Sequence, residues 1–222
     1  MCKSVMICLA IVAAVLVFAV QGQTPPATPA QCSSVVSSLG FNNTNLMGTW
    51  IEVARNPAAN VSCIKINVDL WNNTNLLVNI SHSSSLQSLY MDVNEKANIT
   101  LATDVAASTA GYNVTFTKNG QSETPVYIKL LSTVDSDKYL LGCAYTDANN
   151  NATSYGFILS RGGYTAAGIE AANNNASLYY SNFLNGTYSN VTQLGCYASS
   201  ASQTLPLLTG FLAVAMALIF KA

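Results

Sequence analysis

Residues 63–81 read CIKINVDLWNNTNLLVNIS, and this stretch decides the fold class. In residues 63–70 every second side chain is apolar, and the residues between them (Cys63, Lys65, Asn67 and Asp69) fall on the opposite face. Residues 76–81 alternate in the same way, and the asparagine-rich residues 72–75 between the two runs are typical of a turn. This alternation predicts two half-buried strands joined by a tight turn.

Similar runs recur along the chain at intervals of about a dozen residues, which is typical of an antiparallel sandwich or barrel. Residues 112–117 and 125–131 alternate, with Lys129 opposite the apolar side chains of its run, and Asn119-Gly120 between them favours a hairpin. Further strands are expected at residues 49–55, 89–93 with 98–103, 138–145 and 154–160. Alanine-rich residues 164–183 favour one late helix. We therefore expect about eight strands followed by one amphipathic helix.

The first 22 residues predict a secretory signal peptide. Lys3 precedes an apolar run from Val5 to Val20, and small residues precede a cleavage site after Gly22. The alternative is an N-terminal membrane anchor, but the apolar run is shorter than the ~20 residues that a spanning helix needs.

The C-terminal residues predict a signal for a glycosylphosphatidylinositol (GPI) anchor. Small residues at 198–202 precede an apolar run at 205–220, and only Lys221-Ala222 follow. Ser199 or Ser200 is the expected attachment residue, because an earlier site would remove Cys196. A tail-anchored span or a buried final helix are the alternatives. The mature domain would then cover residues 23–199, and residues 200–222 would be removed.

The composition excludes one class of function and points to the secretory pathway. The net charge is −1 and no stretch is strongly basic, so nucleic acid is not an expected partner. Charged residues make up only 9% of the chain, and N-glycans are the expected solubilising groups. Ten Asn-x-Ser/Thr sequons begin at Asn42, Asn60, Asn72, Asn79, Asn98, Asn113, Asn151, Asn175, Asn185 and Asn190.

The cysteines indicate disulfides and not a metal site. Cys2 and Cys8 leave with the signal peptide, and the four that remain are Cys32, Cys63, Cys143 and Cys196. An even number in an oxidising compartment implies two disulfides, and counting alone leaves three pairings open. The chain has no Cys-x-x-Cys and a single histidine, His82, so we expect neither a metal nor a cofactor.

Two motifs resemble those of the lipocalin family. Residues 45–55, NLMGTWIEVAR, contain Gly48-x-Trp50, and residues 155–161, YGFILSR, end in Arg161. The middle motif, in residues 131–139, departs from the family pattern by an inserted Val134. The resemblance implies an all-β, eight-stranded antiparallel up-and-down barrel with one C-terminal α-helix packed outside. It also implies that Arg161 stacks on Trp50 at the closed end of the barrel.

The cysteines make the sequence most similar to the apolipoprotein D and insect bilin-binding branch of that family. The resemblance to this branch implies the pairing Cys32–Cys143 and Cys63–Cys196. Cys63 lies on the polar face of its strand, which suits a bridge to a tail that runs outside the barrel.

The terminal signals and the sequons predict an extracellular, GPI-anchored glycoprotein, and the family resemblance implies that it binds a small hydrophobic molecule in a barrel cavity. The inward residues expected to form the ligand pocket are Ile66, Val68, Val78, Ile80, Val114, Phe116, Val126 and Ile128. Alternatively, these residues fill the barrel, and the protein is a cell-surface recognition or adhesion glycoprotein with a protein partner and no dedicated ligand. An enzyme is not expected. A histidine beside serines, as in Ser81-His82-Ser83, can act as the base that activates a serine nucleophile. However, no acidic side chain that would orient the histidine accompanies it.

Overall fold

The structure is a computed structural model of the 222-residue chain, and it describes residues 31–36, 46–72, 74–100, 111–178, 180, 183 and 187–198. Outside these ranges lie the expected signal peptide, the C-terminal anchor signal with Ser199 and Ser200, and the sequons at Asn42 and Asn185. Within them, no helix is both long enough and apolar enough to cross a membrane.

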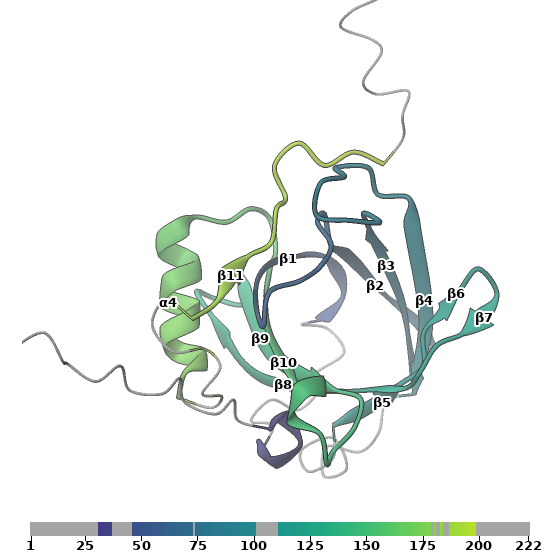
Figure 1. Cartoon of the computed structure of the whole chain (residues 1–222), viewed down its shortest axis with the longest axis horizontal. Coiled ribbons are helices and arrows are strands. Elements are labelled where there is room, and N and C mark those ends of the chain that lie inside the picture. The colour runs from purple at the N-terminus through teal and green to yellow at the C-terminus, as the bar shows by residue number, and fades with distance from the viewer. Residues whose placement is uncertain are drawn as a thin grey trace, which may run out of the picture.

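The described residues form one curved antiparallel sheet and one α-helix (Figure 1). Short 3-10 turns, η1 (Cys32–Ser34) and η2 (Asn151–Thr153), precede the sheet and β10, respectively. The helix is α4 (Ala166–Ala176). The strands are β1 (Gly48–Asn56), β2 (Lys65–Asn72), β3 (Asn75–His82), β4 (Val93–Thr100), β5 (Tyr112–Val114), β6 (Thr117–Lys118), β7 (Gln121–Ser122), β8 (Val126–Val134), β9 (Tyr139–Tyr145), β10 (Tyr155–Ser160) and β11 (Ser189–Asn190).

The sheet closes on itself through the segment 112–118. Its first half, β5, pairs with β8, and its second half, β6, pairs with β4. The remaining strands connect β8 to β4 in the order β8-β9-β10-β1-β2-β3-β4. Counting 112–118 as one strand, the ring has the eight strands expected from the sequence, with β7 and β11 as additions outside it. The expected barrel is therefore confirmed, and the larger strand count reflects the break at Thr115–Phe116.

One strand differs from its prediction. The sequence suggested two short strands at residues 89–93 and 98–103, but β4 is continuous from Val93 to Thr100 and pairs with β3 along its whole length. Glu95 points into the barrel and interrupts the apolar alternation, which hid the central part of this strand. Leu89 is not in a strand, because its carbonyl oxygen accepts a hydrogen bond from the C-terminal segment instead.

The β6–β7 hairpin turns at Asn119-Gly120, as predicted. Both residues have positive φ angles, 51° and 78°, which is the backbone conformation that a two-residue type I′ turn requires. Asparagine and glycine adopt this conformation at the lowest cost.

Trp50 closes one end of the barrel. Its side chain is 1% exposed, and its indole Nε1 donates a hydrogen bond to the carbonyl oxygen of Leu46 at 2.9 Å. The guanidinium carbon of Arg161 lies 4.1 Å from the centre of the Trp50 ring. This stacking forms the cation–π contact that the family resemblance implied, and we call this end the closed end.

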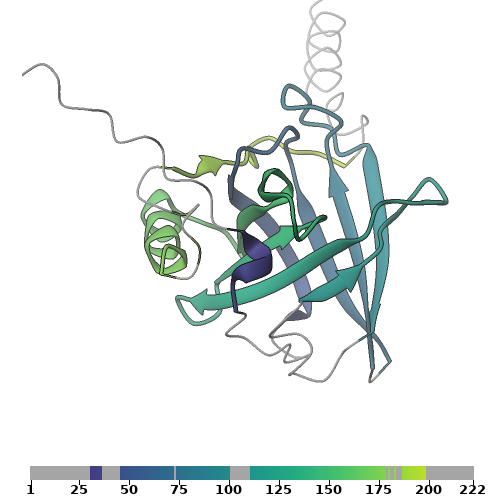
Figure 2. The ribbon, with the colours of Figure 1, turned by 60° about the horizontal axis from the view of Figure 1, so that its bottom comes forward.

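The helix α4 packs against the outside of the barrel over β8, β9 and β10 (Figures 1 and 2). The hydroxyl of Thr165 caps its N-terminus by accepting a hydrogen bond from the backbone N–H of Gly168. Its buried residues are one turn or less apart, at Ile169, Ala172, Asn173 and Ala176. They belong to a second hydrophobic core outside the ring, distinct from the core that lines its interior.

Lys129 occupies the outward face of β8, as its alternation predicted, but it is 0% exposed. The N-terminal segment covers it, and its Nζ donates to the carbonyl oxygens of Ser33 at 2.8 Å and Val35 at 2.7 Å. Burial lowers the pKa of Lys129. Sequence alternation alone could not show this, because the covering segment comes from about a hundred residues earlier in the chain.

Two disulfides fasten both ends of the domain to the outside of the barrel. Cys32 pairs with Cys143 on β9, and Cys63 pairs with Cys196. This is the pairing that the resemblance to the apolipoprotein D branch implied. The bridged cysteines are 111 and 133 residues apart in the sequence, so each bridge closes a long loop. A cross-link lowers the conformational entropy of the unfolded chain more when the loop that it closes is longer.

Gly156 on β10 lies directly against the fully buried ring of Phe183, which a methyl group at this position would overlap. We expect Gly156→Ala to lower the free energy of unfolding by about 1–3 kcal/mol, because a packed core must shift to admit the extra carbon. Chemical denaturation measures the change. The control, Thr117→Ala on an exposed strand position, is expected to stay within about 0.5 kcal/mol of the parent protein. Equal stability of the two variants would contradict the packing of Phe183 on this strand.

Candidate functional site

The barrel encloses a cavity of about 490 Å³. This volume lies in the range of roughly 300–1,000 Å³ that is typical of small-molecule sites in proteins. Trp50 forms its floor, and the wall is mostly aliphatic and aromatic. The expectation that the barrel side chains leave a ligand-sized space, instead of filling it, therefore fits this geometry.

Seven of the eight predicted pocket residues line this cavity, namely Ile66, Val68, Val78, Ile80, Phe116, Val126 and Ile128. The eighth, Val114, is 1% exposed and packs within the surrounding hydrophobic cluster. Alternation identified these side chains because the residues between them in the sequence are mostly polar.

Six further lining residues were not among the predicted pocket residues, three of them on β3, β4 and β8 and three on β9 and β10. They are Leu76, Ile99, Leu130, Leu140, Phe157 and Leu159. All seven residues of β9 and five of six in β10 are buried, because α4 and the N-terminal segment cover the outer face of these strands. A strand with two buried faces shows no alternation, so the sequence carried no signal for which residues point inward.

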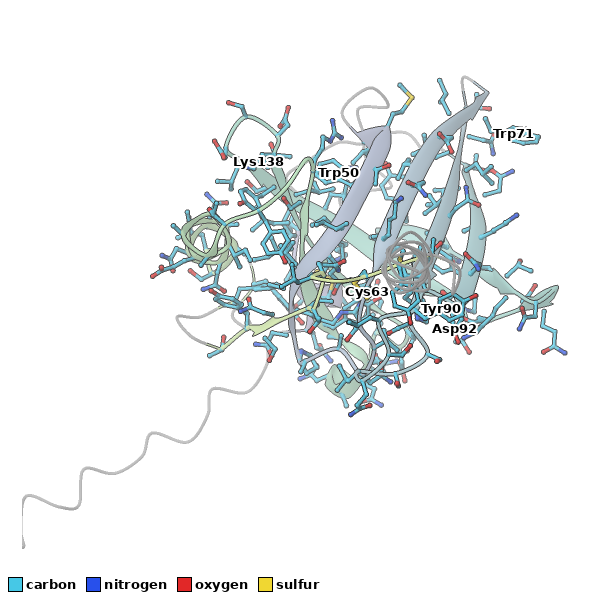
Figure 3. All side chains as sticks on the ribbon, turned by 90° about the horizontal axis from the view of Figure 1, so that it is seen from above. Trp50, Cys63, Trp71, Tyr90, Asp92 and Lys138 are labelled. Carbon is cyan, nitrogen blue, oxygen red and sulfur yellow. A yellow bond between two sulfur atoms is a disulfide. The ribbon has the colours of Figure 1, made fainter. Side chains whose placement is uncertain are left out.

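Charged side chains enter the cavity at the end opposite Trp50, which we call the open end. They are Glu52, Arg55, His82, Glu95, Lys118 and Glu123, and Asn60 and Val61 of the β1–β2 loop lie with them. In Figure 3, Trp50 lies at one end of the barrel, and Cys63, Tyr90 and Asp92 lie toward the other.

Glu52 and Arg55 form the more deeply buried ion pair of this end. Arg55 donates from Nε to Glu52 Oε1 and from Nη2 to Glu52 Oε2, the latter at 2.9 Å. Burial by itself lowers the pKa of Arg55, but the charge of Glu52, the hydrogen bond to it and the nearby Tyr155 together outweigh burial and raise this pKa. The guanidinium also lies 4.4 Å from the centre of the Tyr155 ring, and burial raises the pKa of that phenol.

A second group of charges joins β3, β4 and β6. His82 Nε2 lies 3.1 Å from Glu95 Oε1, and Lys118 Nζ lies 3.7 Å from the same oxygen. The hydrogen bond to Glu95 raises the pKa of His82, although partial burial opposes the shift. In return, the bond from His82 lowers the pKa of Glu95. The open end thus presents paired charges to any ligand in the cavity.

The serines that flank His82 serve the structure of the rim. Ser83 Oγ lies 2.9 Å from the carbonyl oxygen of Ser62 and 2.7 Å from that of Ser85, either of which can accept its proton, and Ser81 Oγ donates to Asn94 Oδ1 at 2.8 Å. In the part of the chain that the structure describes, neither hydroxyl is directed at the imidazole, and no group of three or more metal-ligating side chains comes together. The geometry therefore supports a binding cavity in preference to a nucleophilic site.

The sequons within the described residues lie on strands, in the β1–β2 loop, in η2 and in α4. Asn60, Asn98, Asn113 and Asn190 are exposed, and Asn79 is half-buried on the polar face of β3. Asn151 and Asn175 are half-buried, and each has a buried Oδ1 without a hydrogen-bond partner. The Asn72 side chain lies outside the described part of the structure. Asn60 is the sequon that lines the cavity.

His82 is the only histidine of the chain, so NMR can follow its titration directly. We expect the pKa of His82 to lie above 6.5 and to fall toward that value in Glu95→Gln, which removes the charge of its partner. Because this pKa is raised in the folded protein, the stability that the pair contributes is present below about pH 6.5 and is lost as the pH rises through the folded-state pKa. Glu123→Gln, another carboxylate of the cavity, is the control. A His82 pKa that Glu95→Gln leaves unchanged would contradict the pairing.

Solved structures match this chain at low sequence identity. A biogenic amine-binding protein matches with a TM-score of 0.53 and 17% identity, over 80% of this chain and 95% of that chain. Apocrustacyanin C1 matches with a TM-score of 0.49 and 12% identity, over 78% and 92% of the two chains. A mutant of LTBP1 in complex with leukotriene C4 matches with a TM-score of 0.48 and 17% identity, over 78% and 99%. No protein-family model and no curated protein matches the sequence. The closed ring of eight strands, the outer helix and the arginine stacked on the floor tryptophan identify the lipocalin fold.

Proposed function

We propose that this protein is a lipocalin that binds a small hydrophobic molecule in its barrel and is held on the outer cell surface by a GPI anchor. The observation that supports the binding function is the cavity of about 490 Å³, whose lower part has apolar walls. An apolar ligand in such a site gains roughly 25 cal/mol for each Å² of its surface removed from water.

The distribution of polarity favours a ligand with an apolar body and a polar end. The apolar body would lie over Trp50, where the lining side chains are hydrophobic. The polar end would lie among the charges of the open end, because buried polar groups need partners. The residues of both ion pairs described above line the cavity there.

The sequence signals support the proposed location. A signal peptide, ten sequons and two disulfides are consistent with each other, since all three belong to the secretory pathway. Among lipocalins, the combination of these features with an anchor signal most resembles Lazarillo, a glycolipid-anchored surface protein. The membership of this branch is part of the proposal.

Release from intact cells tests the anchor and the ligand together. We expect a phosphatidylinositol-specific phospholipase to release the protein, and mass spectrometry to find an apolar molecule that co-purifies with it. Ile66→Trp fills the cavity beside Trp50 and is expected to reduce the bound molecule about tenfold or more, whereas Lys65→Trp, on the outward face of the same strand, is expected to retain it.

The outcomes separate the two parts of the proposal. A protein that remains on the cell after phospholipase treatment would favour a spanning tail, and a protein found in the medium would contradict the anchor. Released protein without ligand, or equal ligand content in the two tryptophan variants, would favour the recognition or adhesion function.

Asn60 makes glycosylation relevant to binding, because this sequon lies at the open end of the cavity. The β1–β2 loop is fixed there, since the N–H of Ser62 donates to Ser83 Oγ, the carbonyl oxygen of Ser62 accepts from the N–H of Ser83, and Cys63 is in a disulfide. A glycan on Asn60 would therefore stay beside the opening and slow ligand exchange. We expect ligand uptake and release to be faster in Asn60→Gln than in Asn98→Gln, an exposed sequon on the outside of β4. Stopped-flow fluorescence with an apolar probe measures both rates, and equal rates would contradict this role.

A further inference from the structure

The C-terminal segment leaves the barrel at the open end. After β11 it crosses the outside of β1, where the N–H of Val191 donates to the carbonyl oxygen of Val53 at 3.0 Å. Gln193 then donates from Nε2 to the carbonyl oxygens of Glu52 at 2.7 Å and Ile64 at 3.1 Å. In Figure 1 this yellow segment runs from β11 toward the loop that joins β3 to β4.

Its last residues are fixed to the β3–β4 loop by several independent contacts. Cys196 is bridged to Cys63, and Tyr197 donates its N–H to the carbonyl oxygen of Leu89 and accepts from the N–H of Met91, both at 3.0 Å. The rings of Tyr197 and Tyr90 stack with their centres 5.6 Å apart. The loop itself connects two cavity-lining residues, His82 and Glu95, so this attachment lies on the rim of the cavity.

The proposed anchor follows this point almost immediately. Ser199 and Ser200, the expected attachment residues, are the first and second residues after Ala198. An extended residue adds at most about 3.6 Å, so the protein end of the anchor would lie within roughly 7 Å of Ala198. A spanning tail would also leave the domain from the same place.

The surface around this exit suits contact with lipid. Leu86 is 53% exposed and Leu194 is 86% exposed, and in the chain they come four and three residues before Tyr90 and Tyr197, whose rings stack. Residues 83–92 and 191–198 contain a single charged side chain, Asp92. Exposed leucines can insert among acyl chains, and tyrosines favour the boundary between acyl chains and headgroups. We call Leu86, Tyr90, Leu194 and Tyr197 the rim patch.

We propose that in the anchored protein the open end of the barrel faces the outer leaflet, with the rim patch against the lipid. The cavity then exchanges its apolar ligand with the bilayer over a short path, without carrying it through bulk water. This orientation rests on the proposed membrane attachment. The membrane is the surface that would cover the rim patch, because the expected attachment residues directly follow the patch in the chain.

Energy transfer on intact cells tests the orientation. All four cysteines of the mature domain are in disulfides, so an introduced cysteine provides a single labelling site. Leu86→Cys places a donor dye on the rim patch, and Trp71→Cys, 65% exposed beyond the closed end, is the matched control. With an acceptor dye in the outer leaflet, we expect transfer to be at least about twofold greater from position 86, because the two ends differ by most of a strand length.

A second comparison tests the patch itself. In the Leu86→Cys background, Leu194→Asp is expected to reduce transfer, because a charged side chain disfavours insertion into lipid. Leu70→Asp, an equivalent change at the closed end, is expected to leave it unchanged. Asn60→Gln is expected to raise the energy transfer, because it removes a glycan that would lie between the rim of the barrel and the lipid headgroups.

The outcomes distinguish the orientation from the anchor. Equal transfer from positions 86 and 71 in a protein that phospholipase releases would overturn the orientation and leave the anchor intact. An unaltered signal in Leu194→Asp would overturn the contact of the patch with lipid. The absence of either label from the cell surface in a secreted, folded protein would overturn the anchor, and the orientation with it.

Discussion

The barrel depends on the segment 112–118, which pairs with β8 through its first half and with β4 through its second. Without this segment the sheet would present two unpaired edges, and exposed edges are prone to pair with other chains. Closure also fixes the width of the ring. Eight tilted strands leave an interior in which side chains point inward from all sides but need not meet, which is the physical origin of the cavity.

The hydrophobic core outside the ring contributes mainly to stability, and the core inside the ring forms the binding cavity. The outer core joins α4, the N-terminal segment and the C-terminal segment to the outer face of β8, β9 and β10, and its buried residues are at most 5% exposed. The inner core stops at the cavity wall. Because the outer layer supplies much of the apolar burial, the barrel can keep an unfilled interior, whose apolar surface is then available to a ligand. The two disulfides reinforce this outer layer and leave the interior untouched.

The charges at the open end are compatible with burial because they are paired. Glu52 is 3% exposed but has two hydrogen bonds from Arg55, and Glu95 accepts from His82 near Lys118. An unpaired charge in this position would cost several kcal/mol. The paired arrangement therefore explains how polar residues can line the upper cavity while the floor remains apolar, and it gives the site two chemically different ends.

The sequence by itself determined the faces of β2, β3 and β8, the late helix, the Asn119-Gly120 turn and most of the pocket residues on these three strands, because each of these features is set by neighbours a few residues apart. Only the tertiary structure decided the rest. The burial of Lys129, the inward direction of Glu95 and the lining residues of β9 and β10 depend on segments that are distant in the chain. The alternation of apolar and polar residues indicates which face of a strand is exposed to water. It does not do so where another layer covers the outer face of the strand, or where a charged side chain points inward and pairs with another.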